Sequence, residues 1–436
     1  MAESMVAVAI PGSSPVPQIS RTAVAAAVLG NVLEFYDFST YAFFAVMIGR
    51  AFFPAENPLI SLLLSVATFG VGFITRPLGG FLIGAYSDRA GRKPAMLLTI
   101  ALMGIGMLGL ALTPSYATIG PAAPILVVLA RLIQGFALGG EVGPATSFLI
   151  EAAPPAERGY YASWQLASQG VATLIAGALG VVLSVALSAE AMEAWGWRIP
   201  FLLGMAIIPV GLYIRRHLPE TLDQEAATTQ HSVQGVLSFL FANHLRAVLL
   251  ALLVIMAGTI STYILNYMTT YAMTTLHMAT SVSIAATMMV GLFTLIFSLA
   301  GGLLADRVGR KPVMIVPRIA LVVLAYPAFL MMAEARTATV LLLTTALLTA
   351  LNAIGAAVSL VLIPESLPKS VRSTGLSVAY AVGVTVFGGT TQFVITALIG
   401  ATGNPLSPAW YMIISSLIGV VAMMMMTETK DAALAD

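Results

Sequence analysis

Long apolar stretches recur along the chain, with short polar segments between them. A helix needs roughly 20 apolar residues to cross a hydrocarbon core of about 30 Å. Twelve stretches are long enough, and they predict an all-α polytopic membrane protein with helices over 22–53, 60–86, 95–115, 121–152, 159–188, 196–216, 246–274, 281–305, 313–333, 337–367, 371–399 and 406–428.

The longest polar segment, 217–245, divides these helices six and six. On either side of it a loop sequence repeats, because GAYSDRAGRKP at 84–94 returns as GLLADRVGRKP at 302–312. Internal repeats of this kind are typical of transporters built from two related halves. We therefore predict two pseudo-symmetric six-helix bundles, with the division 1–20 as N-terminal tail, 21–216 as first bundle, 217–245 as cytoplasmic linker, 246–428 as second bundle and 429–436 as C-terminal tail.

Positive charge is concentrated on one set of alternating loops. The outer connections keep only Arg50, Arg198 and Arg336. The inner ones carry Arg89, Arg92, Lys93, Arg158, Arg215, Arg216, Arg246, Arg307, Arg310, Lys311, Lys369 and Arg372. The positive-inside rule then places both termini in the cytoplasm.

Composition narrows the function further. Apolar residues make up 59% of the 436 positions and charged residues only 9%, against roughly 25% charged residues in a soluble domain. A formal net charge of +1 and the lack of nucleic-acid-binding motifs give no indication of a nucleic-acid partner. With no cysteine and four scattered histidines, we expect no metal site, and without a Walker sequence we expect no ATP and no cofactor.

The repeated Gly-x-x-x-Asp-Arg-x-Gly-Arg-Lys loop resembles the signature loop of the major facilitator superfamily, and the resemblance covers essentially the whole chain. The runs GNVLEFYDF at 30–38, RPLGG at 76–80 and RLIQGFALGGE at 131–141 are similar to its metabolite:proton symporter family. The stretches YASWQ at 161–165 and WGWRIP at 195–200 resemble citrate-type members.

The resemblance implies the major facilitator fold and a monomer in the bacterial inner membrane. It also implies that the protein imports an organic carboxylate with protons by alternating access, with citrate or a related di- or tricarboxylate favoured. Its fourth-helix motif is linked to proton coupling, which carries over here to Arg131, Gln134, Gly135 and Gly139. Phe35 stands where many family members have Trp, which leaves the substrate open.

Four ionisable residues are expected near the middle of the membrane. At about 1.5 Å per residue, Glu34 and Arg76 lie about 18 Å from the inner ends of their helices, and Arg131 about 15 Å from an outer end. Asp37 follows Glu34 by about one turn on the same face. Each charge costs about 2.5 to 3.5 kcal/mol at the bilayer centre, so such residues mark functional sites and pair with one another.

We interpret Glu34 or Asp37 as the proton carrier and Arg131 as the group that links proton to substrate. A substrate carboxylate that binds the planar Arg131 guanidinium removes the cationic partner of the acid, which then protonates more easily. The alternative is that Arg131 and Arg76 only neutralise the acids and hold the first bundle together. Both roles can coexist.

Uncharged polar residues complete the predicted substrate site, together with Arg131 and Arg76. The candidates are Tyr36, Gln165, Gln169, Tyr263, Asn266, Tyr267, Asn352 and Tyr380. For most of them, hydrogen bonding between helices is an equally good reading. The second half offers no mid-membrane acid or base, because Arg318 lies only about 9 Å from the inner end of its helix and its side chain can snorkel to the interface.

The repeated cytoplasmic loops are interpreted as a gate. An Asp there can pair with a nearby Arg and lie at the positive N-terminal end of a helix in the other half, which closes the inner side. The alternative is that the basic residues only set topology. The predicted gate contains Asp88, Arg89, Arg92, Glu141, Glu151, Asp306, Arg307, Arg310 and Glu365.

Several other functions compete with carboxylate symport. The same architecture suits proton symport of an aromatic acid, a betaine or another zwitterion. A drug:proton antiporter would typically show a Gly-Pro pair in its fifth helix, and 159–188 contains no proline. A uniporter needs no acid in the membrane, so Glu34 and Asp37 argue against this function. An enzyme would need a nucleophile with a base or a metal set, and a sensor an added soluble domain, and neither pattern appears.

Overall fold

A computed structural model describes residues 21–90, 92–139, 146, 149–150, 153–205, 209, 242–368 and 372–430. The first half contains α1 (Arg21–Phe52), α2 (Pro58–Ile74), α3 (Arg76–Ala90), α4 (Arg92–Leu112), α5 (Tyr116–Ile119), α6 (Ala122–Leu138), α8 (Arg158–Ala186) and α9 (Ala189–Ala194). The second half contains α12 (Leu245–Asn266), α13 (Met268–Thr274), α14 (Thr280–Val308), α15 (Arg310–Ala335), α16 (Ala338–Glu365), α17 (Arg372–Gly383), α18 (Gly389–Thr402) and α19 (Ser407–Met425).

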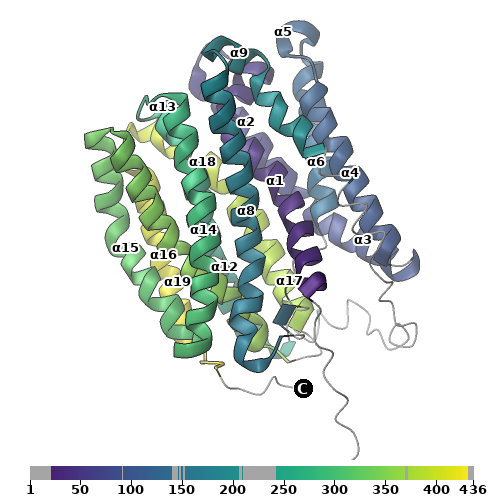
Figure 1. Ribbon diagram of the computed structural model, residues 1–436, viewed down its shortest axis with the longest axis vertical. Coiled ribbons are helices and arrows are strands. Elements are labelled where there is room, and N and C mark those ends of the chain that lie inside the picture. The colour runs from purple at the N-terminus through teal and green to yellow at the C-terminus, as the bar shows by residue number, and fades with distance from the viewer. Residues whose placement is uncertain are drawn as a thin grey trace, which may run out of the picture.

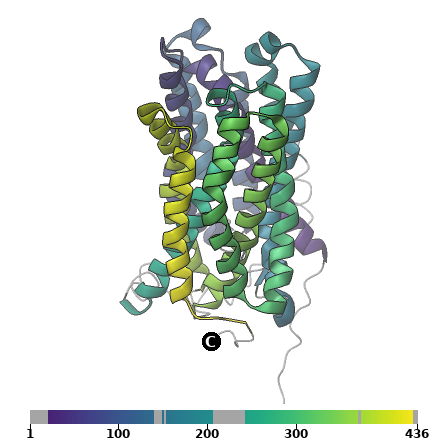
Figure 2. The ribbon, with the colours of Figure 1, turned by 90° about the vertical axis from the view of Figure 1, so that its left-hand side faces the viewer.

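The long helices run along one axis, and the short elements α5, α9 and α13 lie together at one end (Figures 1 and 2). Within the described residues, nine helices are long and apolar enough to span a membrane, and two shorter apolar helices cover Leu97–Leu112 and Ala122–Leu138. The predicted span 196–216 is described only over 196–205 and at residue 209. These segments match the twelve predicted membrane helices, and most of the predicted linker lies outside the described residues.

The two halves meet along α8 and α14, which lie side by side in the centre of the molecule (Figure 1). Glycine makes this approach possible, since a Cβ on Gly291 would lie 2.3 Å from the backbone nitrogen of Leu174. A second contact joins α2 and α18, where a Cβ on Gly70 would lie 2.3 Å from the Gly389 carbonyl oxygen. Small residues let helix backbones pack closely inside membranes, so these two pairs hold the halves together.

The chain departs from regular α-helix on both sides of the contact between α2 and α18. The predicted helix 60–86 is broken at Thr75, because Pro77 has no N–H to donate to the Phe73 carbonyl. The Phe73 carbonyl oxygen instead accepts from the Thr75 N–H and, at 3.3 Å, from the Thr385 hydroxyl. Thr385 belongs to a π-helix, Val384–Gly388, that interrupts the predicted helix 371–399. Single π turns inside α-helices are frequent at functional sites.

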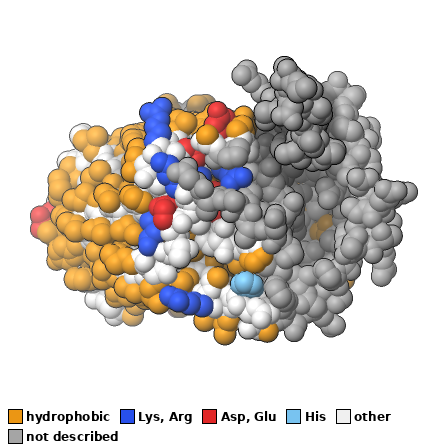
Figure 3. All heavy atoms as spheres, turned by 90° about the horizontal axis from the view of Figure 1, so that it is seen from below, with side chains coloured by type: hydrophobic (Ala, Val, Ile, Leu, Met, Phe, Trp, Pro, Cys, Tyr) orange, Lys and Arg blue, Asp and Glu red, His pale blue; other side chains and the backbone are white. Residues whose placement is uncertain are grey.

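Charged side chains gather on the lower end of the molecule, and the described surface beside them is largely apolar (Figure 3). Leu304, Val316 and Val323, on α14 and α15, are exposed apolar residues. This distribution fits a protein whose sides contact lipid and whose end contacts water.

Candidate functional site

A cavity of about 90 Å³ lies between the two halves. Helices α1, α2 and α8 line it from the first half, and α12, α14, α16 and α17 from the second. No described residue that lines it is charged. Its polar lining consists of Ser39, Gln169, Thr173, Thr259, Thr262, Tyr263, Asn266, Thr294, Ser359 and Tyr380.

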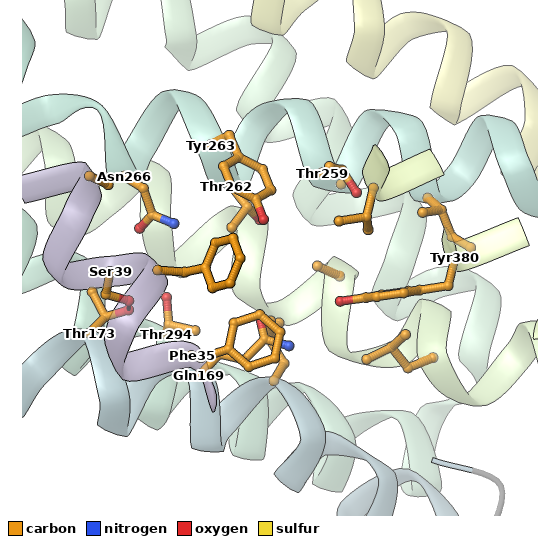
Figure 4. A pocket seen from close by; sticks show the side chains of 18 of the residues that line it. Phe35, Ser39, Gln169, Thr173, Thr259, Thr262, Tyr263, Asn266, Thr294 and Tyr380 are labelled. Carbon is orange, nitrogen blue, oxygen red and sulfur yellow. Dashed lines mark hydrogen bonds between the residues drawn. The ribbon is translucent and has the colours of Figure 1, made fainter. Parts of the chain in front are cut away.

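The polar groups are spread along the cavity (Figure 4). Ser39, Thr173, Thr294 and Asn266 gather towards one end, whereas Tyr380 lies towards the other end and points its hydroxyl along the cavity. The cavity therefore offers hydroxyl and amide groups from both halves, and a ligand that binds there contacts both bundles.

A buried ion pair lies close to the cavity without lining it. Arg131 Nη1 donates to Asp37 Oδ2 at 3.0 Å and to Gln134 Oε1 at 2.7 Å. Gln134 Nε2 in turn donates to Asp37 Oδ1 at 2.9 Å. All three residues are fully buried, while Nε and Nη2 of Arg131 have no hydrogen-bond partner among the described residues. Of the four charges predicted near mid-membrane, Arg131 and Asp37 thus lie together, and Gln134 completes a closed triad with them.

An aromatic layer separates this triad from the cavity. The Arg131 guanidinium carbon lies 4.5 Å from the ring centroid of Phe38 and 5.5 Å from that of Phe69, and both rings line the cavity. Tyr41 covers it at 4.6 Å. Stacked rings stabilise a guanidinium by cation–π attraction. Arg131 is therefore one ring away from any ligand in the cavity.

Arg76 begins α3 directly after the break at Thr75. Its guanidinium carbon lies 4.1 Å from the ring centroid of Phe73 and 4.5 Å from that of Phe38. It is 8% exposed, and its Nε and Nη2 atoms have no hydrogen-bond partner in the described part of the chain. Arg76 is thus a buried cation with unused donors beside the same aromatic layer.

The structure divides the uncharged candidates into two groups. Gln169, Tyr263, Asn266 and Tyr380 line the cavity. The other four are not among its lining residues and bond to neighbouring helices instead. Tyr36 donates to the Pro200 carbonyl, Gln165 pairs with Asn31, Tyr267 accepts from Thr396, and Asn352 bonds to Arg318 and Thr262.

Arg318 corrects the prediction made from its position along the chain. Its side chain is 1% exposed, so it does not snorkel. Its Nη1 donates to Asn352 Oδ1 at 3.0 Å and to the Ser261 hydroxyl at 3.1 Å, because the long side chain points inward between α12 and α16. The second half therefore does hold a buried cation, whose partners Ser261 and Asn352 are polar residues within apolar helices.

A contact between the halves involves one of the repeated loops, which are predicted to be cytoplasmic. Asp306 at the end of α14 accepts the backbone N–H of Gly159 at 2.8 Å and that of Tyr160 at 2.9 Å, both in the first turn of α8. The carboxylate therefore lies at the positive end of a helix in the other half. Arg310 supports it, with Nη1 at 3.0 Å from Asp306 and Nε at 3.2 Å from Glu365.

The segment after α19 lies against the same loop. Glu428 accepts the backbone N–H groups of Arg310 and Lys311, and Thr429 donates to Glu365. Partial burial works to raise the pKa of the Glu428 carboxyl, but four backbone N–H donors outweigh it and lower that pKa. The side chain of Arg307 is exposed, and its carbonyl accepts from Lys430.

Several predicted residues fall outside the described set. The side chains of Glu34, Asp88, Arg89 and Arg92 and the whole of Glu141 and Glu151 lie outside the described residues. Their predicted roles stay predictions.

Comparison with known proteins adds to this geometry. Residues 27–384 match the sequence profile of the Major Facilitator Superfamily. The chain is 37% identical over 414 residues to a citrate-proton symporter of Salmonella typhi, covering 94% of this chain and 95% of that protein. It is 34% identical to a glycine betaine/proline/ectoine/pipecolic acid transporter of Dickeya dadantii, covering 95% and 84%. A crystal structure of a D-xylose-proton symporter superposes with a TM-score of 0.77 at 18% identity, covering 94% and 99%.

Proposed function

Because this chain belongs to the Major Facilitator Superfamily, a family of membrane transporters and not enzymes, we propose that it is a proton-coupled symporter for a small organic carboxylate. Citrate or a related di- or tricarboxylate is the favoured substrate, since the Salmonella typhi relative is a citrate-proton symporter. The protein works as a monomer in the bacterial inner membrane, with both termini in the cytoplasm and alternating access as its mechanism.

The buried Arg131–Asp37–Gln134 triad is the observation that carries the proposal. A proton on Asp37 neutralises the acid and leaves Arg131 as an uncompensated cation one aromatic ring from the cavity. That net charge attracts an anion into the cavity, because charges interact strongly where water is excluded. By linkage, an anion in the cavity favours the proton on Asp37 to the same degree. Proton and substrate then load together.

Glu34 is the second candidate for the proton, since it precedes Asp37 by about one turn of the same helix. Gln169, Tyr263, Asn266 and Tyr380 supply hydrogen bonds to the substrate. The contact of Asp306 with α8 closes the cytoplasmic side and breaks when the cavity opens inward. Asp88 and its neighbours form the corresponding part of the gate in the first half.

A zwitterion such as a betaine is the second candidate substrate. The cavity is lined by the rings of Phe35, Phe38, Phe69, Tyr263 and Tyr380, and aromatic faces bind quaternary ammonium groups. The Dickeya dadantii relative, a betaine and proline transporter, supports the same alternative.

Uptake of radiolabelled citrate into proteoliposomes tests the proposal. An inward proton gradient should drive accumulation by the wild type, and unlabelled di- and tricarboxylates should compete. Asp37→Asn should abolish the stimulation by the gradient while citrate exchange persists, and Glu334→Gln, an exposed acid elsewhere, should behave as wild type. Gradient-driven uptake of betaine with no uptake of any acid would replace the carboxylate by a zwitterion.

A further inference from the structure

Arg318 is a buried cation in the second half. In the described part of the chain no carboxylate lies within ion-pairing distance of it, although its side chain is 1% exposed. Its Nε and Nη2 atoms have no hydrogen-bond partner among the described residues. An unpaired charge in the membrane interior is costly, so its presence calls for a partner that arrives from outside the protein.

Two hydrogen bonds connect Arg318 to the cavity, and in each of them the group nearer to Arg318 is the donor. A guanidinium can only donate, so Arg318 Nη1 fixes the Asn352 amide with its oxygen towards the cation at 3.0 Å. The Asn352 Nδ2 then donates to the Thr262 hydroxyl oxygen at 2.9 Å. Thr262 lines the cavity and keeps its own proton to donate there (Figure 4). Charge at Arg318 therefore strengthens a donor that faces the cavity.

Arg318 also lies directly behind a thin part of the cavity wall. Its Nη2 is 3.7 Å from the point that a Cβ on Gly258 would occupy, and Ala356 is the next neighbour at 3.8 Å. Gly258 and Ala356 both line the cavity. Gly258 and Ala356 thus occupy positions where a larger side chain would separate the unused Nη2 donor of Arg318 from a ligand.

We propose that Thr262, Gly258 and Arg318 form a second anion subsite, on the side of the cavity formed by the second half, which binds a second carboxylate of the substrate. This inference rests on the proposed carboxylate symport and deepens it. The first carboxylate is attracted from the first half, where Arg76 and Arg131 lie behind Phe38. A substrate with two acidic groups then spans both bundles, whereas a zwitterion or a monocarboxylate leaves the second subsite empty.

Binding of citrate, succinate and lactate to the purified full-length protein tests the subsite, by titration of the thermal unfolding temperature in detergent with lipid. Arg318→Gln and Thr262→Val should weaken the binding of citrate and succinate by about 10-fold or more, the scale of a hydrogen bond to a charged group. The affinity for lactate should stay unchanged. Thr344→Val is the matched control, since Thr344 is buried on α16, donates to carbonyl groups of its own helix and is not among the residues that line the cavity.

Gly258→Ala distinguishes a loss of citrate affinity from a loss of folding stability. The added methyl meets only ordinary contacts and removes a helical glycine, so the unfolding temperature should hold or rise while citrate affinity falls. Equal losses for lactate and citrate in Arg318→Gln, or citrate binding as in the wild type in all three variants, would overturn the subsite alone. If the wild-type protein binds none of the three acids, the proposed carboxylate function fails, and the subsite fails with it.

Discussion

The proposed role of the contact between Asp306 and α8 as a cytoplasmic gate can be tested quantitatively. The carboxylate, whose side chain is 8% exposed, accepts two backbone N–H groups at 2.8 and 2.9 Å. Asp306→Asn keeps one acceptor and turns an amide N–H towards a backbone N–H. The loss of one charge-assisted hydrogen bond and of the helix-dipole attraction should cost the closed state about 2 kcal/mol, which corresponds to about 30-fold in the equilibrium between closed and open.

The absence of cysteine makes distance measurement direct. Spin labels on Glu157→Cys, just before α8, and Val308→Cys, at the end of α14, report the separation of the halves by pulsed electron–electron double resonance, since both residues are exposed. Asp306→Asn should move population from the short to the long distance, and Glu334→Gln in the same labelled background should leave the distribution unchanged. Identical distributions for Asp306→Asn and wild type would refute the role of this contact in closure.

Three further predictions concern positions with simpler roles. Glu428→Gln should lower the unfolding temperature at pH 7, because the lowered pKa of Glu428 contributes stability that is fully present above the ordinary glutamate pKa, about 4.3; the difference from wild type should shrink as pH falls below 4.3 and through the lowered pKa, and a difference that does not change below pH 4.3 would contradict it. Tyr36→Phe should cost about 1 kcal/mol of stability, seen as a lower unfolding temperature, and leave the KM for substrate unchanged, because its hydroxyl bonds to Pro200 and not to the cavity. Gly291→Ala should impair folding and uptake, since its Cβ would lie 2.3 Å from a backbone atom of α8, and wild-type behaviour would contradict the close packing of the halves.

The number and order of the membrane helices could be predicted because lipid imposes a length and a polarity on every span. The irregularities inside the spans could not be predicted in the same way. Pro77 lies within the predicted helix 60–86, but only the packing around Thr75 decides that the helix breaks there. The π-helix Val384–Gly388 has no comparable signal beyond its neighbouring glycines.

Depth along a helix located the Arg131–Asp37 pair, because charges in hydrocarbon must find each other. Depth alone gave a wrong prediction for the Arg318 side chain, which does not extend to the interface but reaches inward from a backbone position near the helix end. Helical spacing also left open which polar residues face the cavity. Gln165 and Gln169 are one turn apart, yet only Gln169 lines the cavity, while Gln165 bonds to Asn31 on α1.

The break at Thr75 and the π-helix that faces it mark a place where the two bundles can bend at low cost. A bend in an intact turn would open backbone hydrogen bonds in hydrocarbon, where no water replaces them. At this level the Phe73 carbonyl is already released from its helical partner and shared with Thr385 of the opposite bundle. A rocking motion can exchange these bonds without opening an intact helical turn, so the protein places deformability where its two halves already share a backbone acceptor.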